Sequence, residues 1–172
     1  MNPDTKLPAA APAHPTAVIG VMLSTDWPEL APRGPLRVLV TSNVKWAPHM
    51  LSLPGGKVDT ADHAVSSKPA DVAVYRELFE EVGLPTGASN VIPVWEGWTQ
   101  EHPLHYVRAY RVFPAKMYQR LHMDALRAEE GARLVWIEPH LLADVCPYAT
   151  TNMPAVQAAC GMVELEKGSH ER

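Results

Sequence analysis

The chain has 172 residues, of which 47% are hydrophobic, and its formal net charge is −4 at pH 7, which suits one domain with a packed core. Its mixed charges exclude an extended basic surface for nucleic acid, and no apolar run approaches the roughly 18 residues that span a bilayer. Cys146 and Cys160 provide neither a C-x-x-C pair nor a disulfide framework, and residues 1–15 do not resemble a secretory signal. We therefore expect a cytoplasmic protein.

The N-terminal third alternates short strands with loops. Residues 1–15 contain four prolines and four alanines, which predicts a flexible lead-in before a folded domain over 16–165 and a polar tail over 166–172. Apolar and branched side chains predict strands over 17–24 and 36–40, and the prolines between them predict a loop. A short strand over 51–53 should end at Pro54-Gly55-Gly56.

The remaining elements are strands mixed with a few helices. Residues 60–69 should form a surface insertion, exposed over 61–68, before the best helix of the chain over 70–82. We expect strands over 91–98, 104–113 and 132–138, a polar helical stretch over 115–128, and short helices over 139–145 and 153–163. Strict strand–helix alternation is absent, which indicates an α+β domain.

The helix over 70–82 carries a cluster of three carboxylates. At about 100° per residue, Glu77, Glu80 and Glu81 share one arc of roughly 100°. The opposite side is apolar, so we expect it to pack while the three glutamates point outward. The apolar residues on that side are Val72, Tyr75, Leu78, Phe79 and Val82.

The carboxylate cluster has two interpretations. Like charges three or four positions apart repel and destabilise a helix, and a hard divalent cation such as Mg²⁺ or Mn²⁺ would relieve this repulsion. The other interpretation is a solvated acidic surface.

The flanking residues favour the metal interpretation. Gly55 and Gly56 allow the backbone to approach a ligand closely, and Lys57 adds a charge suited to phosphate. Arg76 lies one residue before Glu77 and four before Glu80, where its guanidinium can hold a carboxylate by paired hydrogen bonds. Gly83 is expected to end the helix.

These residues resemble a known family. RELFEEVGL, from Arg76 to Leu84, matches the second half of the Nudix box, and LPGGKV, from Leu53 to Val58, is similar to its beginning. The resemblance implies the α/β/α sandwich with a mixed β-sheet that Nudix proteins share. It also implies a hydrolase that cleaves a diphosphate linkage in a nucleoside diphosphate derivative.

The spacing within the box departs from the family. Gly56 and Arg76 are 20 positions apart, about six more than the pattern has. Counting forward from Gly56 places Asp62 where the family has glutamate, whereas counting back from Arg76 places Lys68 there. Either Asp62 substitutes with a shorter side chain or the role is lost.

The resemblance also implies site residues. Glu80 and Glu81 would bind Mg²⁺ or Mn²⁺, Glu77 would be a further ligand or a base, the Gly56 carbonyl would complete the shell, and Arg76 would orient the glutamates. Gly55, Gly56 and Lys57 would contact the substrate. Many family members place another glutamate near the metal from a later loop; the candidates are Glu129 and Glu130, of which Glu130 is the preferred catalytic residue.

The sequence indicates less about the substrate than about the reaction. Trp46 is the preferred aromatic for stacking on a base, while Trp95, Trp98, Tyr106 and Trp136 are more typical of packing. His102 and His105 could bind metal or phosphate. The expected ligand is a nucleotide or another small molecule with a diphosphate, and a homodimer is left open.

Three other classes of protein are alternatives to the hydrolase. A non-catalytic Nudix-fold module that binds nucleotides or regulates would normally have a degraded box, whereas this box keeps every helix carboxylate. A prenyl diphosphate isomerase shares the fold, but no cysteine lies close to the box. A P-loop enzyme is excluded because G-x4-G-K-[ST] is absent.

Overall fold

The computed structural model describes residues 10–42, 47, 49–100, 104–115, 126 and 132–170, with side chains as far as residue 161. In this part of the chain, no helix is both long and apolar enough to cross a membrane.

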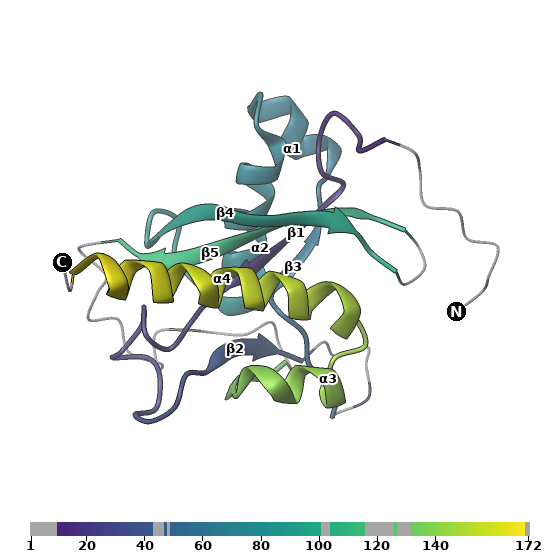
Figure 1. Cartoon of the computed structure of the whole chain (residues 1–172). Coiled ribbons are helices and arrows are strands. Elements are labelled where there is room, and N and C mark those ends of the chain that lie inside the picture. The colour runs from purple at the N-terminus through teal and green to yellow at the C-terminus, as the bar shows by residue number, and fades with distance from the viewer. Residues whose placement is uncertain are drawn as a thin grey trace.

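A four-stranded mixed sheet forms the centre of the molecule (Figure 1). Its strand order is β3-β1-β5-β4; β1 and β5 run parallel, and the two outer pairs are antiparallel. The strands are β1 (Ala17–Val21), β3 (Gly55–Lys57), β4 (Ser89–Trp98) and β5 (Tyr106–Pro114).

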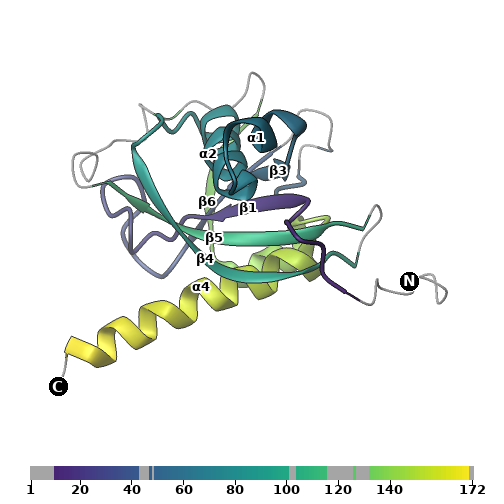
Figure 2. The same cartoon turned by 90° about the horizontal axis from the view of Figure 1, so that it is seen from above.

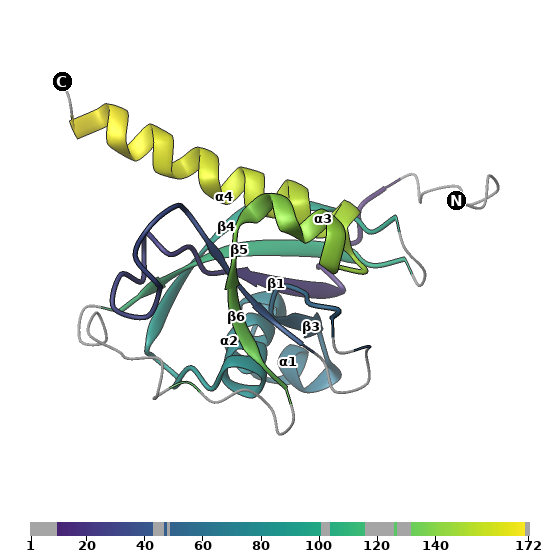
Figure 3. The same cartoon turned by 90° about the horizontal axis from the view of Figure 1, so that it is seen from below.

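A second, smaller sheet pairs β2 (Val38–Thr41) with β6 (Leu134–Ile137) in antiparallel register (Figure 3). Two isolated bridges, Leu23 with Val38 and Thr41 with Ser52, connect β2 to the chain on either side of it.

Helices cover both faces of the central sheet (Figures 1 and 2). One face carries α2 (Pro69–Val82), which also packs on α1 (Thr60–Val65). The other face carries α4 (Ala149–His170), preceded by the 3-10 helix η3 (Pro139–Leu141) and α3 (Leu142–Val145). The molecule is thus an α+β protein, an α/β/α sandwich around a mixed sheet.

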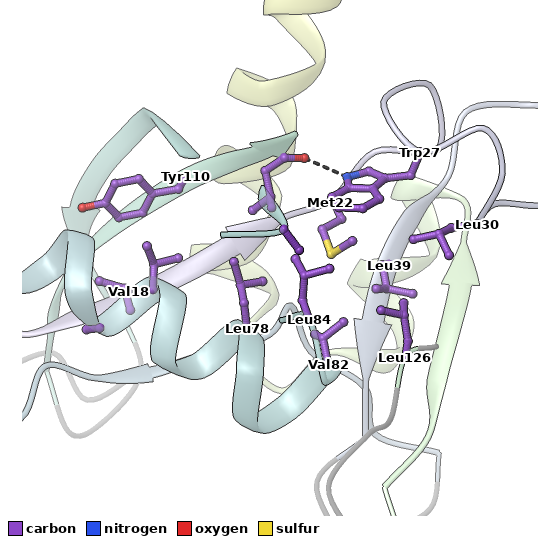
Figure 4. Packing of buried hydrophobic residues seen from close by; sticks show 14 of the residues in the cluster. Val18, Met22, Trp27, Leu30, Leu39, Leu78, Val82, Leu84, Tyr110 and Leu126 are labelled. Carbon is purple, nitrogen blue, oxygen red and sulfur yellow. Dashed lines mark hydrogen bonds between the residues drawn. The ribbon is translucent and has the colours of Figure 1, made fainter. Parts of the chain in front are cut away.

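The alternation of side chains along the strands divides the core in two. Val18 of β1 and Met22, the residue after β1, pack toward α2. Ile19 and Val21 of β1 belong to the cluster under α4. Figure 4 shows the first cluster, where the Trp27 indole donates a hydrogen bond of 2.9 Å to the carbonyl of Val112. Both clusters meet at β1, which fixes β3 and the start of α2 relative to the rest.

Most predicted elements are present, with shifted boundaries. The strand expected over 51–53 is reduced to the bridge at Ser52, and the strand that pairs with β1 is Gly55–Lys57. The last helix is longer than expected, because it begins at Ala149 and continues to His170. The helical prediction over 115–128 falls almost entirely outside the described residues.

Candidate functional site

The packed face of the box helix α2 overlaps the expected one only in part, because Leu78 and Val82 are buried as predicted but Phe79 is not. Phe79 is 58% exposed, whereas Glu77 is only 8% exposed. The prediction that Phe79 packs inward and that all three glutamates point outward was therefore wrong. Small side chains explain the rotation, because Ala70, Ala73 and Val74 are fully buried and bring the helix close to the sheet.

The glycine pair of β3 is required by the resulting close contacts. A Cβ at Gly56 would lie 2.4 Å from Oε1 of Glu77, and one at Gly55, where φ is +158°, would lie 2.2 Å from the carbonyl oxygen of Val18. The Glu77 carboxylate thus fills the space that a side chain at residue 56 would need. This contact places Glu77 directly against the backbone of β3.

Arg76 links the box helix to β3. Its Nη1 donates hydrogen bonds to Glu77 Oε1 at 2.7 Å and to Glu80 Oε2 at 3.2 Å, and its Nη2 donates to the carbonyl of Lys57 at 2.8 Å. The predicted role of Arg76 in orienting Glu77 and Glu80 agrees with these contacts.

Asp62 also binds Arg76, and it is buried although its neighbours in α1 are exposed. Arg76 Nε and Nη2 donate to the two carboxylate oxygens at 3.3 and 3.1 Å, and the backbone N–H of Asp59 donates to Asp62 Oδ2 at 2.8 Å. The side chain of Asp59 lies 3.5 Å from Arg76 Nη2, a contact that the sequence analysis missed. Asp62, one of the two residues that the spacing offers for the first box glutamate, thus contacts the box arginine.

Burial and ion pairing set the protonation of this cluster. Burial raises the pKa of Glu77, although Arg76 opposes the shift. Burial also opposes ionisation of Asp62, but the hydrogen bonds from Arg76 and from the backbone of Asp59 prevail and lower its pKa. The hydrogen bond to Asp62 is the main cause that raises the pKa of Arg76, so the guanidinium stays charged.

Glu81 lies at the boundary between the box and a cavity of about 480 Å³. Its Oε2 accepts a hydrogen bond of 2.8 Å from the backbone N–H of Gly55. The cavity is lined by Ala17, Val18, Ile19, Thr41, Ser52, Leu53, Gly55, Gly56, Lys57, Glu81, Thr99, His105, Val107, Tyr148, Thr151 and Asn152. The structure thus brings four sequence candidates, Gly55, Gly56, Lys57 and Glu81, to one cavity.

The beginning of α4 contributes polar groups that the sequence analysis did not single out. Asn152 is 2% exposed, and its Nδ2 donates to Ser52 Oγ at 2.9 Å and to Cys146 Sγ at 3.1 Å. Tyr148 and Thr151 line the same cavity. The available signal was the polar group Thr150-Thr151-Asn152 at the start of an otherwise apolar helical stretch.

The aromatic and histidine candidates divide into three groups. His105 lines the cavity. Trp95 and Trp136 pack against the two core clusters, and Trp98 stacks edge-on against Tyr106 with ring centroids 5.3 Å apart. Trp46, His102, Glu129 and Glu130 lie outside the described residues.

The donor set of the box fits a hard divalent cation. It offers only oxygen ligands, from three carboxylates on one helix and the backbone of Gly56 beside them. Arg76 now holds Glu77 and Glu80, while Glu81 is turned to the Gly55 N–H. Within the described residues, no three acidic, histidine or cysteine side chains are already gathered into a metal site.

Comparison with known proteins identifies the fold. No family model matches the chain, and no curated protein matches it in sequence. Solved structures do match: Ap4A hydrolase from C. elegans has a TM-score of 0.60 at 14% identity, covering 86% of this chain and 96% of that one. The NUDIX domain of Shewanella oneidensis NrtR, complexed with ADP ribose, has a TM-score of 0.59 at 14% identity, covering 92% and 94%. The Nudix hydrolase RenU from M. smegmatis has a TM-score of 0.53 at 18% identity, covering 87% and 88%.

Proposed function

We propose that this Nudix-fold protein is a divalent-metal-dependent hydrolase that cleaves a diphosphate linkage in a nucleoside diphosphate derivative. The observation that carries the proposal is the position of Glu81. It belongs to the carboxylate cluster of the box helix, and it also lines a cavity of about 480 Å³, which falls in the range of small-molecule sites.

Glu77, Glu80 and Glu81, with the carbonyl of Gly56, would hold Mg²⁺ or Mn²⁺. When bound, such a cation neutralises phosphate oxygens and makes water a better nucleophile. Glu77 serves as a further ligand or accepts the proton of the attacking water.

The other box residues position these groups and the substrate. Arg76 holds Glu77 and Glu80 in place and ties them to β3 through the Lys57 carbonyl. Gly55, Gly56 and Lys57 would contact the diphosphate, because all three line the cavity. Trp46 and Glu130 remain candidates on sequence grounds.

Similar structures support a nucleotide substrate. One is an Ap4A hydrolase, and another was solved with ADP ribose. Ap4A and ADP ribose both contain nucleosides linked through phosphoanhydride bonds, which is the class of compound that we propose for this site.

A non-catalytic nucleotide-binding module is the second candidate. It is favoured by the hydrogen bonds of the carboxylates, because Glu77 and Glu80 accept from Arg76 whereas Glu81 accepts from the Gly55 N–H. In this case the cavity would bind a nucleotide that the protein leaves intact.

One experiment separates the two candidates. Purified protein is incubated with a panel of nucleoside diphosphate derivatives, with and without Mg²⁺, and the products are resolved by chromatography. A hydrolase releases two phosphorylated products from at least one compound, only with the metal present. A compound that binds by calorimetry, with no turnover of any compound in the panel, would instead support the binding module.

A further inference from the structure

Two basic side chains line the same cavity as the carboxylate of Glu81. Lys57 comes from the last position of β3, and His105 immediately precedes β5; both line the cavity. Neither residue lies on the box helix, so the geometry of the carboxylate cluster does not account for them.

The register of the sheet places the two residues on one side. Lys57 pairs with Ala17 of β1, and Ala17 pairs in turn with Val107 of β5. His105 is two positions before Val107, so its side chain leaves the same face of the sheet. Ala17, which lies between Lys57 and Val107 in this register, also lines the cavity.

The backbone fixes both residues. The carbonyl of Lys57 accepts the hydrogen bond from Arg76 at 2.8 Å, while its side chain lines the cavity. The N–H of His105 donates to Thr99 Oγ1 at 2.8 Å, and its carbonyl accepts from the Thr99 N–H at 2.8 Å. A ligand would therefore meet two basic groups whose backbone positions are already determined.

The electrostatics of this end of the cavity favour an anion. Burial and the nearby charge of Lys57 lower the pKa of His105, so the neutral imidazole can donate one hydrogen bond beside the Lys57 ammonium. The first turn of α4 lies on the same cavity through Tyr148, Thr151 and Asn152, at the end of the molecule where β5 begins (Figure 1).

We propose that Lys57 and His105 form a second phosphate subsite, so that the preferred substrate carries a further phosphate beyond the linkage that is cleaved. The inference rests on the proposed function for the position of the scissile linkage, which lies at the carboxylate cluster. Such a subsite selects nucleotides with at least three consecutive phosphates over diphosphates that end in a neutral group.

Binding of non-hydrolysable probes tests the subsite directly. In the presence of Mg²⁺, calorimetry compares the affinity of the protein for a methylene-bridged triphosphate with its affinity for a methylene-bridged diphosphate. We expect the wild type to bind the triphosphate at least about tenfold more tightly, since a charged hydrogen bond contributes roughly that factor or more. Lys57→Gln and His105→Gln should each lose most of this preference, while Lys57→Arg should keep it.

Matched substitutions outside the cavity control for total charge. Lys68→Gln and His140→Gln change the same residue types, and neither residue lines the cavity. Both should retain the wild-type preference. The subsite is overturned if the wild type shows no preference, or if Lys57→Gln retains it while remaining folded by its melting temperature.

Turnover separates this inference from the function on which it rests. A protein that hydrolyses diphosphate derivatives but binds both probes equally keeps the proposed function and loses the subsite. One that prefers the triphosphate through Lys57 and His105 but hydrolyses nothing keeps the subsite and loses the hydrolase.

Discussion

Arg76 determines much of the local chemistry of the box. It contacts the carboxylates of Asp62, Glu77 and Glu80 and the carbonyl of Lys57 at distances between 2.7 and 3.3 Å. Glu81 is outside this network and is held by Gly55. The carboxylates of one helix therefore have different surroundings, and their substitutions should have different consequences.

Glu80→Gln and Glu81→Gln should each lower kcat by at least about 100-fold, because metal-borne charge stabilisation is worth several kcal/mol. Steady-state kinetics on the best substrate of the panel measures the loss. Glu138→Gln, at the end of β6, is the matched control and should retain wild-type turnover. Full activity in both box variants would mean that the glutamates of the helix form only an acidic surface and do not take part in catalysis.

Glu77→Gln should raise the melting temperature of the metal-free protein at neutral pH. The pKa of Glu77 in the folded protein is raised above its usual value of 4.5. The folded state therefore loses stability relative to the unfolded state as the pH rises from 4.5 through the folded-state pKa, because Glu77 must then ionise in a buried site. The stabilisation by glutamine should thus be full above the folded-state pKa and vanish in acid. Calorimetry across pH measures it, and a difference that grows toward acid would contradict the shift.

Asp62→Asn should destabilise the protein by about 1–3 kcal/mol, because it weakens buried, charge-assisted hydrogen bonds to Arg76. Its effect on kcat should be much smaller than that of Glu81→Gln, since Asp62 acts through Arg76. Urea unfolding and kinetics on the same samples measure both quantities. If Asp62→Asn lowers kcat as much as Glu81→Gln, Asp62 belongs among the metal ligands.

At the scale of elements, the segment of the box that carries the extra residues forms the short helix α1 and its connection to α2. Its residues are exposed except for Asp62, with Ser66 half-buried in the connection to α2. The Asp59–Asp62 capping box starts α1 and at the same time directs the Asp62 carboxylate to Arg76. The first turn of α1 therefore makes one buried contact, through Asp62, and the rest of the helix is exposed.

Deleting residues 63–68 should leave a folded protein, because this deletion keeps Asp62 and restores the spacing of the family pattern. Deleting residues 61–68 should lower the melting temperature further, since it removes the Asp62–Arg76 contact as well. Circular dichroism on both variants measures the difference. Insoluble protein from the shorter deletion would show that the exposed part of α1 belongs to the core.

At the scale of the whole molecule, the cavity is built where the layers meet. The central sheet contributes Ile19 and Val107, the neighbourhood of the second sheet contributes Thr41 and Ser52, and α4 contributes Asn152. The hydrogen bond from Asn152 to Ser52 joins α4 to the segment before β3. The shape of the cavity therefore depends on the assembly of all the layers.

The sheet begins at Thr16, whose N–H donates to the carbonyl of Tyr106 at 2.8 Å and whose carbonyl accepts from Val58 at 3.0 Å. Deleting residues 1–13 leaves both bonds, so the melting temperature and kcat/KM should stay at wild-type values. Deleting residues 1–16 removes both and should lower the melting temperature. Loss of activity without unfolding in the shorter truncation would place that segment in the site.

The sequence by itself determined the elements of the box and the kind of chemistry they favour. The end of α2 at Gly83, which has φ of +70°, follows from local backbone preference. The spacing of Arg76, Glu77 and Glu80 follows from helical periodicity, which depends only on residues within two turns. Local signals of this kind need no knowledge of distant parts of the chain.

Only the tertiary structure decided which face of α2 is buried, what Asp62 contacts and what surrounds Glu81. The helical wheel favoured Phe79 over the alanines as a packing residue, but in the fold Ala70 and Ala73 are buried and Gly20 of β1 makes room for Leu78, which a Cβ there would approach to 3.1 Å. Asp62 could be assigned only through its contact with Arg76, and the cavity joins residues between 17 and 152 in the sequence. These features depend on contacts between distant segments, and a linear pattern does not encode which segments will meet.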